Sequence, residues 1–401
     1  MFYDDYREAE WILPLVDYYT TKEKPINILM PIHPRTERQK IIFKWISSFG
    51  VNILYPYDLI YGNREKDVFR KITLNSKILQ KLLCSPNGKF SNTFKLGNIQ
   101  RELALKNIYK LFENIGYVYI PEGSINAKTQ QNSIVKIVFD AAKYKNRLTV
   151  AYPISLYEKL RNVEKHNQNI DLIMTVSSKS RQMCKSANLL AVNLGAQRFK
   201  ELWLENIQMY FDSVKQSNSI LRKVKSGEPR IVLLLLKNRT GLVSGFLTSR
   251  QVSEYRKNYL QRLAEMNFFV IVKPHPGSKS HAFQKDLSQV VTLKYEISEL
   301  PIVYLASICS FSVAELPTNS IFDVLSCKKN VFWPCEYLED SSCINLAINM
   351  IEKGFPEDFF NYSRFGLPSK FNLKYTSPNI SKVIDSKVEI SDVDSYIESV
   401  M

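Results

Sequence analysis

Short apolar runs alternate along the first half of the chain with amphipathic segments of helical period. A run of about four to eight apolar residues bounded by turn residues predicts a buried parallel strand, and apolar residues three and four positions apart predict a helix. The segment 35–50 is such a helix, with Ile41, Ile42 and Trp45 on one face and Gly50 at its end. Strands are expected at 26–34, 51–57, 117–120, 147–154, 169–177 and 189–199, and helices at 8–20, 35–50, 66–115, 133–144 and 200–214.

The alternation restarts after a polar, basic stretch. Strands are expected at 230–238, 268–276, 290–295 and 330–334, and helices at 249–266, 298–307, 321–325 and 338–354. Strand-helix-strand alternation predicts an α/β fold, here two Rossmann-like domains with parallel sheets that face each other across a cleft. The expected divisions are a first domain at 1–214, a linker at 215–230, a second domain at 231–375 and an acidic tail at 376–401.

The net charge of the chain limits the classes of binding partner. The 401 residues carry a net charge of +15, which suits nucleic acid, an anionic membrane face or an anionic substrate. No helix-turn-helix, zinc-finger or RNP-like pattern is present, so nucleic acid is not the expected partner. The aliphatic run 231–236 is far shorter than the roughly 18 residues of a membrane helix, and the acidic N-terminal segment lacks a signal-peptide layout. We expect a cytoplasmic protein, with peripheral contact to the anionic inner membrane face as one option.

The six cysteines form no Cys-x-x-Cys pair, which predicts reduced, mostly buried thiols. No Asp-x-Asp motif follows an expected strand. We therefore expect no metal site and no cofactor.

The strongest candidate for chemistry is the segment 268–280, where an apolar run leads into Lys273, Pro274, His275 and Pro276 and then a turn at Gly277. Ligands of open α/β sheets bind at the carboxyl ends of strands, and two prolines stiffen the loop there. A cation and an imidazole in that place suit a phosphate. The alternative is an ordinary histidine in a proline-rich turn.

Two weaker signals lie in the same half. Gly241 lies in a loop between an expected strand and helix, where a phosphate can be held, although no complete Gly-x-Gly-x-x-Gly or Walker pattern is present. Thr318, Asn319 and Ser320 precede an apolar helix, whose first N–H groups can bind a phosphate. The alternative for these three residues is a plain helix cap.

In the first half, Glu122 follows an expected strand on a turn with Gly123 and Ser124, a position suited to a general base. The alternative is a turn glutamate that points to solvent. His33 and Arg35 end another expected strand, and they either line the cleft or belong to a loop that caps the next helix.

Together these groups predict a transferase that uses a nucleotide-activated donor. The Lys-Pro-His-Pro segment, the SELPIVYL segment at 298–305 and the polar residues before an apolar helix resemble the bacterial sialyltransferase and polysialyltransferase group, and more loosely capsule and teichoic-acid transferases of the GT-B type. The segment 194–203 also resembles a Gly-x-x-Arg-Phe segment of such enzymes. Where that group has two acidic residues before Gly, this chain has Pro121 and Glu122; where it has Ser-Ser, this chain has Asn319 and Ser320, with Ser310 and Ser312 as rival candidates.

The resemblance implies a GT-B, inverting, metal-independent enzyme with a CMP-linked nonulosonic acid donor and a surface glycan or glycolipid acceptor. It implies Glu122 as the base and His275, Lys273 and Ser320 as phosphate ligands. Val303 stands where the group often has Glu, which leaves the nucleotide open. Three alternatives remain: a CDP-linked glycerol-phosphate transferase, a nucleotide-sugar 2-epimerase, which the segment 31–40 resembles, and a non-catalytic basic scaffold or nucleic-acid-binding protein.

Overall fold

A computed structural model gives the fold of this chain. It describes residues 2–3, 9–30, 34, 36–55, 58, 98–121, 134–153, 170–214, 222, 230–236, 247–275, 280–316, 318–338, 344–345, 348, 364–365, 367, 385 and 387–400.

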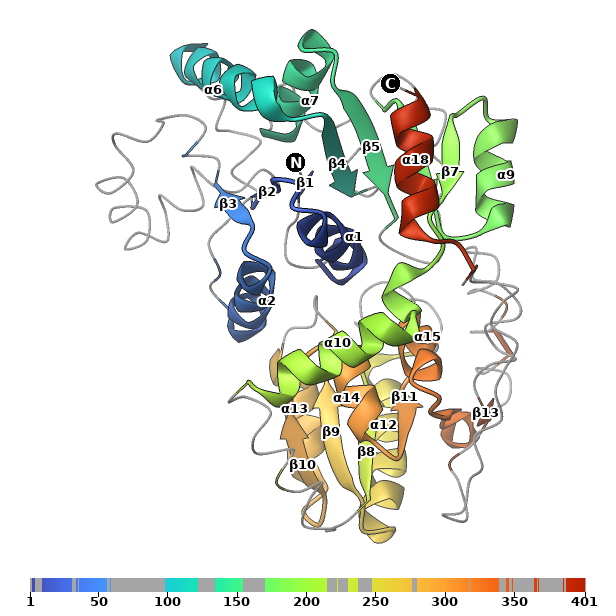
Figure 1. Ribbon diagram of the computed structural model, residues 1–401. Coiled ribbons are helices and arrows are strands. Elements are labelled where there is room, and N and C mark those ends of the chain that lie inside the picture. The colour runs from blue at the N-terminus through green and yellow to red at the C-terminus, as the bar shows by residue number, and fades with distance from the viewer. Residues whose placement is uncertain are drawn as a thin grey trace. The chain divides into compact units, whose positions relative to one another are not determined.

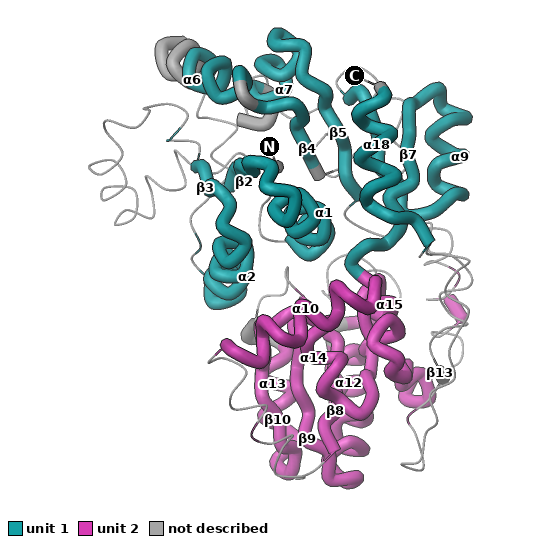
Figure 2. The backbone as a smooth tube through the Cα atoms, viewed as in Figure 1, with its two compact units in different colours: residues 1–198, 383–401 teal, residues 199–382 magenta. Residues whose placement is uncertain are grey.

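The chain divides into two compact units, which Figure 2 shows in two colours. Unit 1 comprises residues 1–198 and 383–401, and unit 2 comprises residues 199–382. Both boundaries differ from the expected ones. The helix expected to close the first domain, α10 (Glu201–Asp212), belongs to unit 2, and the expected acidic tail contributes a packed helix to unit 1.

Packing explains the position of α10. Its buried face carries Trp203, Ile207 and Phe211, and the Phe211 ring lies 5.5 Å from that of Tyr304. The Tyr304 hydroxyl donates a hydrogen bond of 3.0 Å to Asp212. Both contacts tie α10 to α14 (Ile302–Ile308) of unit 2.

Within the described part of unit 1, seven parallel strands form one sheet in the order β3-β2-β1-β4-β5-β6-β7. The strands are β1 (Phe2–Tyr3), β2 (Asn27–Leu29), β3 (Asn52–Leu54), β4 (Tyr117–Pro121), β5 (Leu148–Tyr152), β6 (Leu172–Thr175) and β7 (Ala191–Asn193). The first strand is central, the next two extend the sheet on one side, and the rest extend it on the other. This order is that of a doubly wound Rossmann-like sheet.

Helices cover both faces of this sheet. One core cluster joins α6 (Asn98–Leu111), the short 3-10 helix η1 (Phe112–Asn114), α7 (Ile134–Tyr144) and α9 (Ser178–Ser186) to inward residues of the strands, including Val118 and Ile120. Side chains alternate along a strand, so Tyr119 faces the other way, toward α1 (Ala9–Thr21). Helix α1 in turn packs against α2 (Glu37–Ser48), which begins with a capping box between Thr36 and Gln39.

The C-terminal helix α18 (Ile390–Val400) also belongs to unit 1 and lies beside β7 (Figure 1). Asp385, in the segment that leads to α18, lies over β6 and β7. Its N–H donates to the carbonyl of Val176, and its side chain accepts hydrogen bonds from Asn193 (2.9 Å) and Ser178 (3.3 Å). Gly195 has φ +66°, and a Cβ there would collide with the Asp385 carbonyl oxygen. Only glycine fits that close approach.

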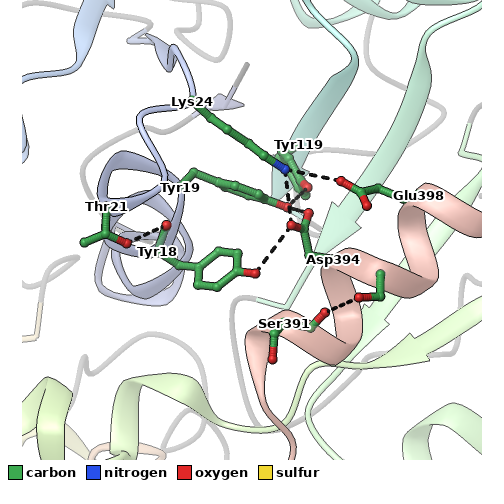
Figure 3. Close-up of polar contacts among 9 residues, drawn as sticks. Tyr18, Tyr19, Thr21, Lys24, Tyr119, Ser391, Asp394 and Glu398 are labelled. Atoms are coloured by element: carbon green, nitrogen blue, oxygen red, sulfur yellow. Dashed lines mark hydrogen bonds and ion pairs between the residues drawn. The ribbon is translucent and has the colours of Figure 1, made fainter.

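A buried polar cluster, here called the Asp394 cluster, joins α18 to α1 and β4 (Figure 3). Asp394 accepts hydrogen bonds from Tyr19 (2.9 Å), Lys24 (3.2 Å) and Tyr18 (3.4 Å), and the Tyr19 and Tyr119 hydroxyls are 2.7 Å apart. Burial, followed by the hydrogen bond between the two phenols and the charge of Asp394, raises the pKa of Tyr19 far above its ordinary value.

In unit 2, the described residues form a six-stranded sheet in the order β10-β9-β8-β11-β12-β13, again parallel. The strands are β8 (Ile231–Leu235), β9 (Phe269–Lys273), β10 (Lys294–Ile297), β11 (Phe311–Ala314), β12 (Val331–Trp333) and β13 (Arg364–Phe365). Again the first strand is central and the chain extends the sheet first on one side and then on the other. The α/β prediction of two Rossmann-like units is confirmed.

The inner strands β8 and β9 of unit 2 are buried along their whole length because both faces of the sheet are covered. Helices α12 (Ser249–Glu265) and α13 (Ser280–Gln289) share a core cluster with Val232, Val270 and Val272. Helix α14 contacts β8, and α15 (Ser320–Ser326) contacts both β12 and α14. In the described residues no helix is long and apolar enough to cross a membrane.

Candidate functional site

The carboxyl edge of the unit 2 sheet is the natural place for a ligand. Connections that leave β8 and β11 run to opposite sides, and the crevice outside such a switch point is where doubly wound sheets bind ligands. Leu235 at the end of β8 is in register with Lys273 of β9 on one side and Ala314 of β11 on the other. With strands about 4.8 Å apart, the ends of β9 and β11 lie about 10 Å from each other across β8.

Lys273 is the last residue of β9 and is 96% buried, with a relative exposure of 4%. Val272 packs toward α12 and α13, so the Lys273 side chain lies on the opposite face of the sheet. Its Nζ is 3.8 Å from a carboxylate oxygen of Glu299, which follows β10. A lysine ammonium kept this far from solvent is held by nearby acceptors, and Glu299 is one of them.

His275 lies two residues beyond Lys273 and is half-buried. Because β9 is next to β8, this imidazole follows a strand that borders the switch point. The structure therefore carries Lys273 and His275 at the edge that the sequence predicted for them. Pro276 and Gly277 lie outside the described residues.

Thr318, Asn319 and Ser320, at the start of α15, make different contacts. The Thr318 hydroxyl accepts a hydrogen bond of 3.0 Å from the backbone N–H of Ser320, so it satisfies the first free N–H group of α15 from the position before the N-cap residue Asn319. The Asn319 side chain makes no capping bond, and in the described part of the chain its Oδ1 is buried without a hydrogen-bond partner. An amide oxygen accepts hydrogen bonds, which a hydroxyl or amino group supplies and an ionised phosphate does not. Ser320 is half-buried at the start of the helix.

A charged group, here called the Arg256 cluster, lies under the same edge and was not expected from the sequence. Arg256 of α12 is 2% exposed, and its guanidinium donates to Asp286 of α13 at 2.7 Å and to Glu315 at 2.6 Å. Glu315 is the residue that follows β11, and its backbone carbonyl accepts a 2.7 Å hydrogen bond from the Tyr255 hydroxyl. The cluster thus fixes the first residue of the connection that leads to Thr318 and Asn319.

The electrostatics of the Arg256 cluster keep it charged. Burial lowers the pKa of Arg256, but the neighbouring Glu315 and Asp286 carboxylates outweigh that effect, and its pKa lies above the ordinary value. Burial, followed by the charge of Glu315, raises the pKa of Tyr259 well above its usual range. The one sequence signal was the position of Arg256 in the apolar stripe of α12, between Tyr255 and Tyr259.

Helix α12 also begins at this edge, where Thr248 and Gln251 form a capping box. The Thr248 hydroxyl accepts from the Gln251 N–H at 3.2 Å, so that N–H is already used. Gly241, expected in the loop before this helix, lies outside the described residues.

The first-half candidates Glu122, Gly123, Ser124, His33 and Arg35 also lie outside the described residues. The strands that lead to them are described: β4 ends at Pro121 and β2 at Leu29, and both flank the central β1. The roles of these five residues stay predictions. In the portion of the chain that the structure describes, no group of three His, Cys, Asp or Glu side chains is placed to hold a metal ion.

No protein-family model matches the sequence, and no curated protein matches it. Among solved structures, the fold is similar to UDP-GlcNAc 2-epimerase from Neisseria meningitidis bound to UDP-GlcNAc, at 12% identity and a TM-score of 0.49, over 99% of this chain and 98% of that one. It is similar to the Methanocaldococcus jannaschii UDP-GlcNAc 2-epimerase at 10% identity and a TM-score of 0.47, over 98% of both chains. A glycosyltransferase from Rickettsia africae ESF-5 gives 10% identity and a TM-score of 0.42, over 88% of this chain and 86% of that one.

Proposed function

We propose that this chain is a GT-B-type enzyme that acts on a nucleotide-activated sugar, with the nucleotide held at the carboxyl edge of the unit 2 sheet. One observation carries the proposal: Lys273 ends β9 and His275 follows it on one side of the switch point, and the polar residues at the start of α15 follow β11 on the other. A cation and an imidazole suit the phosphate, and the unpaired Asn319 oxygen suits a hydroxyl of the ribose or an amino group of the base.

The proposed reaction is an inverting transfer. The acceptor hydroxyl oxygen attacks the anomeric carbon from the face opposite the nucleotide, the bond between that carbon and the phosphate oxygen breaks, and the acceptor proton passes to a base. Glu122 is the proposed base, and Lys273 and His275 stabilise the negative charge that develops on the leaving phosphate. The proposed donor is a CMP-linked nonulosonic acid and the acceptor a surface glycan or glycolipid. No metal ion is required in this scheme, because the cationic side chains take that role.

Nucleotide binding gives the direct test. We expect CMP to raise the melting temperature of the full-length protein, since a ligand that binds only the folded state stabilises it by mass action. His275→Ala should weaken CMP binding by about ten- to one-hundred-fold, the value of a hydrogen bond to a charged group. Calorimetric titration of the purified variant measures the dissociation constant.

The matched control is Lys294→Ala, which removes a cation from the opposite, amino end of the same sheet and should leave CMP binding unchanged. Stabilisation by CDP in place of CMP would move the proposal to a CDP-linked donor. A response to UDP alone would favour the 2-epimerase. If none of the nucleotides changes the melting temperature, or if His275→Ala binds as the unaltered protein does, the proposed site is wrong.

A further inference from the structure

Tyrosines and lysines gather at the ends of α6 and α7 in unit 1, in a group here called the Tyr-Lys patch (Tyr109, Tyr144, Lys106, Lys110 and Lys145), of which Tyr109 and Lys145 are half-buried and the others exposed. The Tyr109 and Tyr144 rings stack with centroids 4.7 Å apart at 26°, and the Lys145 ammonium lies 5.7 Å from the Tyr109 ring centroid. The Tyr144 side chain is 70% exposed, and Lys106 and Lys110 are exposed on the same helix as Tyr109.

The patch lies away from the ligand edge of its sheet. Helix α6 with η1 ends two residues before β4 begins, and α7 ends three residues before β5 begins. Both helix ends therefore lie at the amino edge of the strands, opposite the carboxyl edge where a doubly wound sheet takes its substrates. A role for the patch is thus separate from the nucleotide chemistry proposed above.

Helix electrostatics account for part of the charge but not for the whole patch. Cations in the last turn of a helix complement its dipole, which explains Lys110. Lys106 lies further from the helix end, and an aromatic ring as exposed as that of Tyr144 adds nothing to the core. Residues 105–114 and 137–147, which surround the patch, carry the carboxylates Glu113 and Asp140 and the cations Lys106, Lys110, Lys143, Lys145 and Arg147, so five cations minus two anions leave a local charge of +3.

We propose that the Tyr-Lys patch binds the surface of an anionic phospholipid membrane. Tyrosine is enriched at the level of lipid head groups because its ring is apolar and its hydroxyl polar, and lysines near it gain from the negative surface potential. Single-stranded nucleic acid fits the patch less well, because such sites use successive aromatic faces along a basic groove. Here the two rings stack on each other, and Tyr109 has Lys145 as a further partner.

Vesicle sedimentation tests this inference with the full-length protein. Phosphatidylcholine vesicles that contain about one-third phosphatidylglycerol should bind the protein, and pure phosphatidylcholine vesicles should bind it much more weakly. The double variant Lys106→Gln, Lys110→Gln should lower the partition coefficient about 25-fold, because each lysine near an anionic surface contributes about 1 kcal/mol, or roughly fivefold. Tyr144→Ala should lower it further.

The control variant Lys179→Gln, Lys185→Gln removes the same charge from exposed positions of α9 and should change binding less than about twofold. Circular dichroism checks that each variant is folded, and glutamine is a good helix former. Equal losses in the two double variants would overturn the proposal in favour of an effect of total charge. No binding to anionic vesicles, or loss only of binding to a single-stranded oligonucleotide, would overturn it as well. None of these outcomes depends on whether a nucleotide binds to unit 2.

Discussion

The two units build sheets of the same strand order but place their buried polar groups differently. In unit 1, the Asp394 cluster lies beside β4 and joins the last helix of the chain to the first. In unit 2, the Arg256 cluster lies at the carboxyl edge, where Glu315 begins the connection after β11. Buried polar side chains must be paired in both places. In one unit that pairing attaches a terminus, and in the other it fixes the backbone at the proposed ligand edge.

The charged side chains of the two clusters also differ in their exposure to water. Arg256 has two carboxylate partners with every member nearly inaccessible, whereas Lys24, the cation beside Asp394, has a side chain 39% exposed. Loss of one partner from a fully buried ionic group costs more than loss from a group that water reaches. The comparison therefore predicts a larger effect in unit 2 than in unit 1.

The largest expected effect follows from Arg256→Ala, which leaves Glu315 and Asp286 buried without their cation. We expect a loss of about 3–5 kcal/mol in the stability of unit 2, measured by urea unfolding. The control Arg250→Ala removes a solvent-exposed arginine of the same helix and should change little. An Arg256→Ala protein with unchanged unfolding would show that the cluster does not hold the edge of the sheet.

A smaller effect is expected from Asp394→Asn, which keeps the shape of the side chain and removes the charge that Tyr19 and Lys24 contact. Hydrogen bonds to charged groups are worth about 1.5–3 kcal/mol, so α18 should become easier to release. Hydrogen exchange of the amides in residues 390–400 measures this release. Asp392→Asn is the matched control, because Asp392 is exposed on the same helix. If both variants exchange at the same rate, Asp394 does not attach the helix.

The smallest effect appears only at alkaline pH. Burial raises the pKa values of Tyr19 and Tyr119 in the folded protein, although the hydrogen bond with Tyr19 offsets part of the rise at Tyr119, whereas the unfolded chain titrates near pH 10. Stability from these phenols is therefore complete below about pH 10 and is lost as the pH rises above it. The melting temperature should fall less steeply between roughly pH 10 and 12 in Tyr119→Phe than in the unaltered protein. Equal slopes of melting temperature against pH in the two proteins would show that burial does not raise the pKa of Tyr119.

The sequence predicted those parts of the fold that depend on local patterns. The run that became β9 and the amphipathic stripe of α12 were both correctly expected, because burial on one or two faces leaves a period in the sequence. The two-residue strand β1 and the strand β11, interrupted by Ser312, left no such period. Helix α18 was taken for an acidic tail, because its buried residues Val393 and Ile397 make only a narrow stripe.

The same distinction applies to the candidate site. The position of Lys273 and His275 could be expected, because the end of a buried strand and the loop after it lie at the sheet edge, while their role in binding stays a prediction. The Arg256 cluster was missed because its members come from α12, α13 and the end of β11, and only tertiary packing brings them together. The hydrogen bond from the Ser320 N–H to the Thr318 hydroxyl also depends on backbone geometry that no residue pattern specifies.

The contact between Tyr19 and Asp394 spans 375 residues of sequence and has a consequence for the order of synthesis. A ribosome makes the first part of unit 1, then all 184 residues from 199 to 382, and only then the segment that covers Gly195 and carries α18. At about 5–20 residues per second, the first part waits roughly 10–40 s for its last helix. During that interval the surface beside β7 that α18 will cover lacks this helix, and the nascent protein can associate with other chains through it.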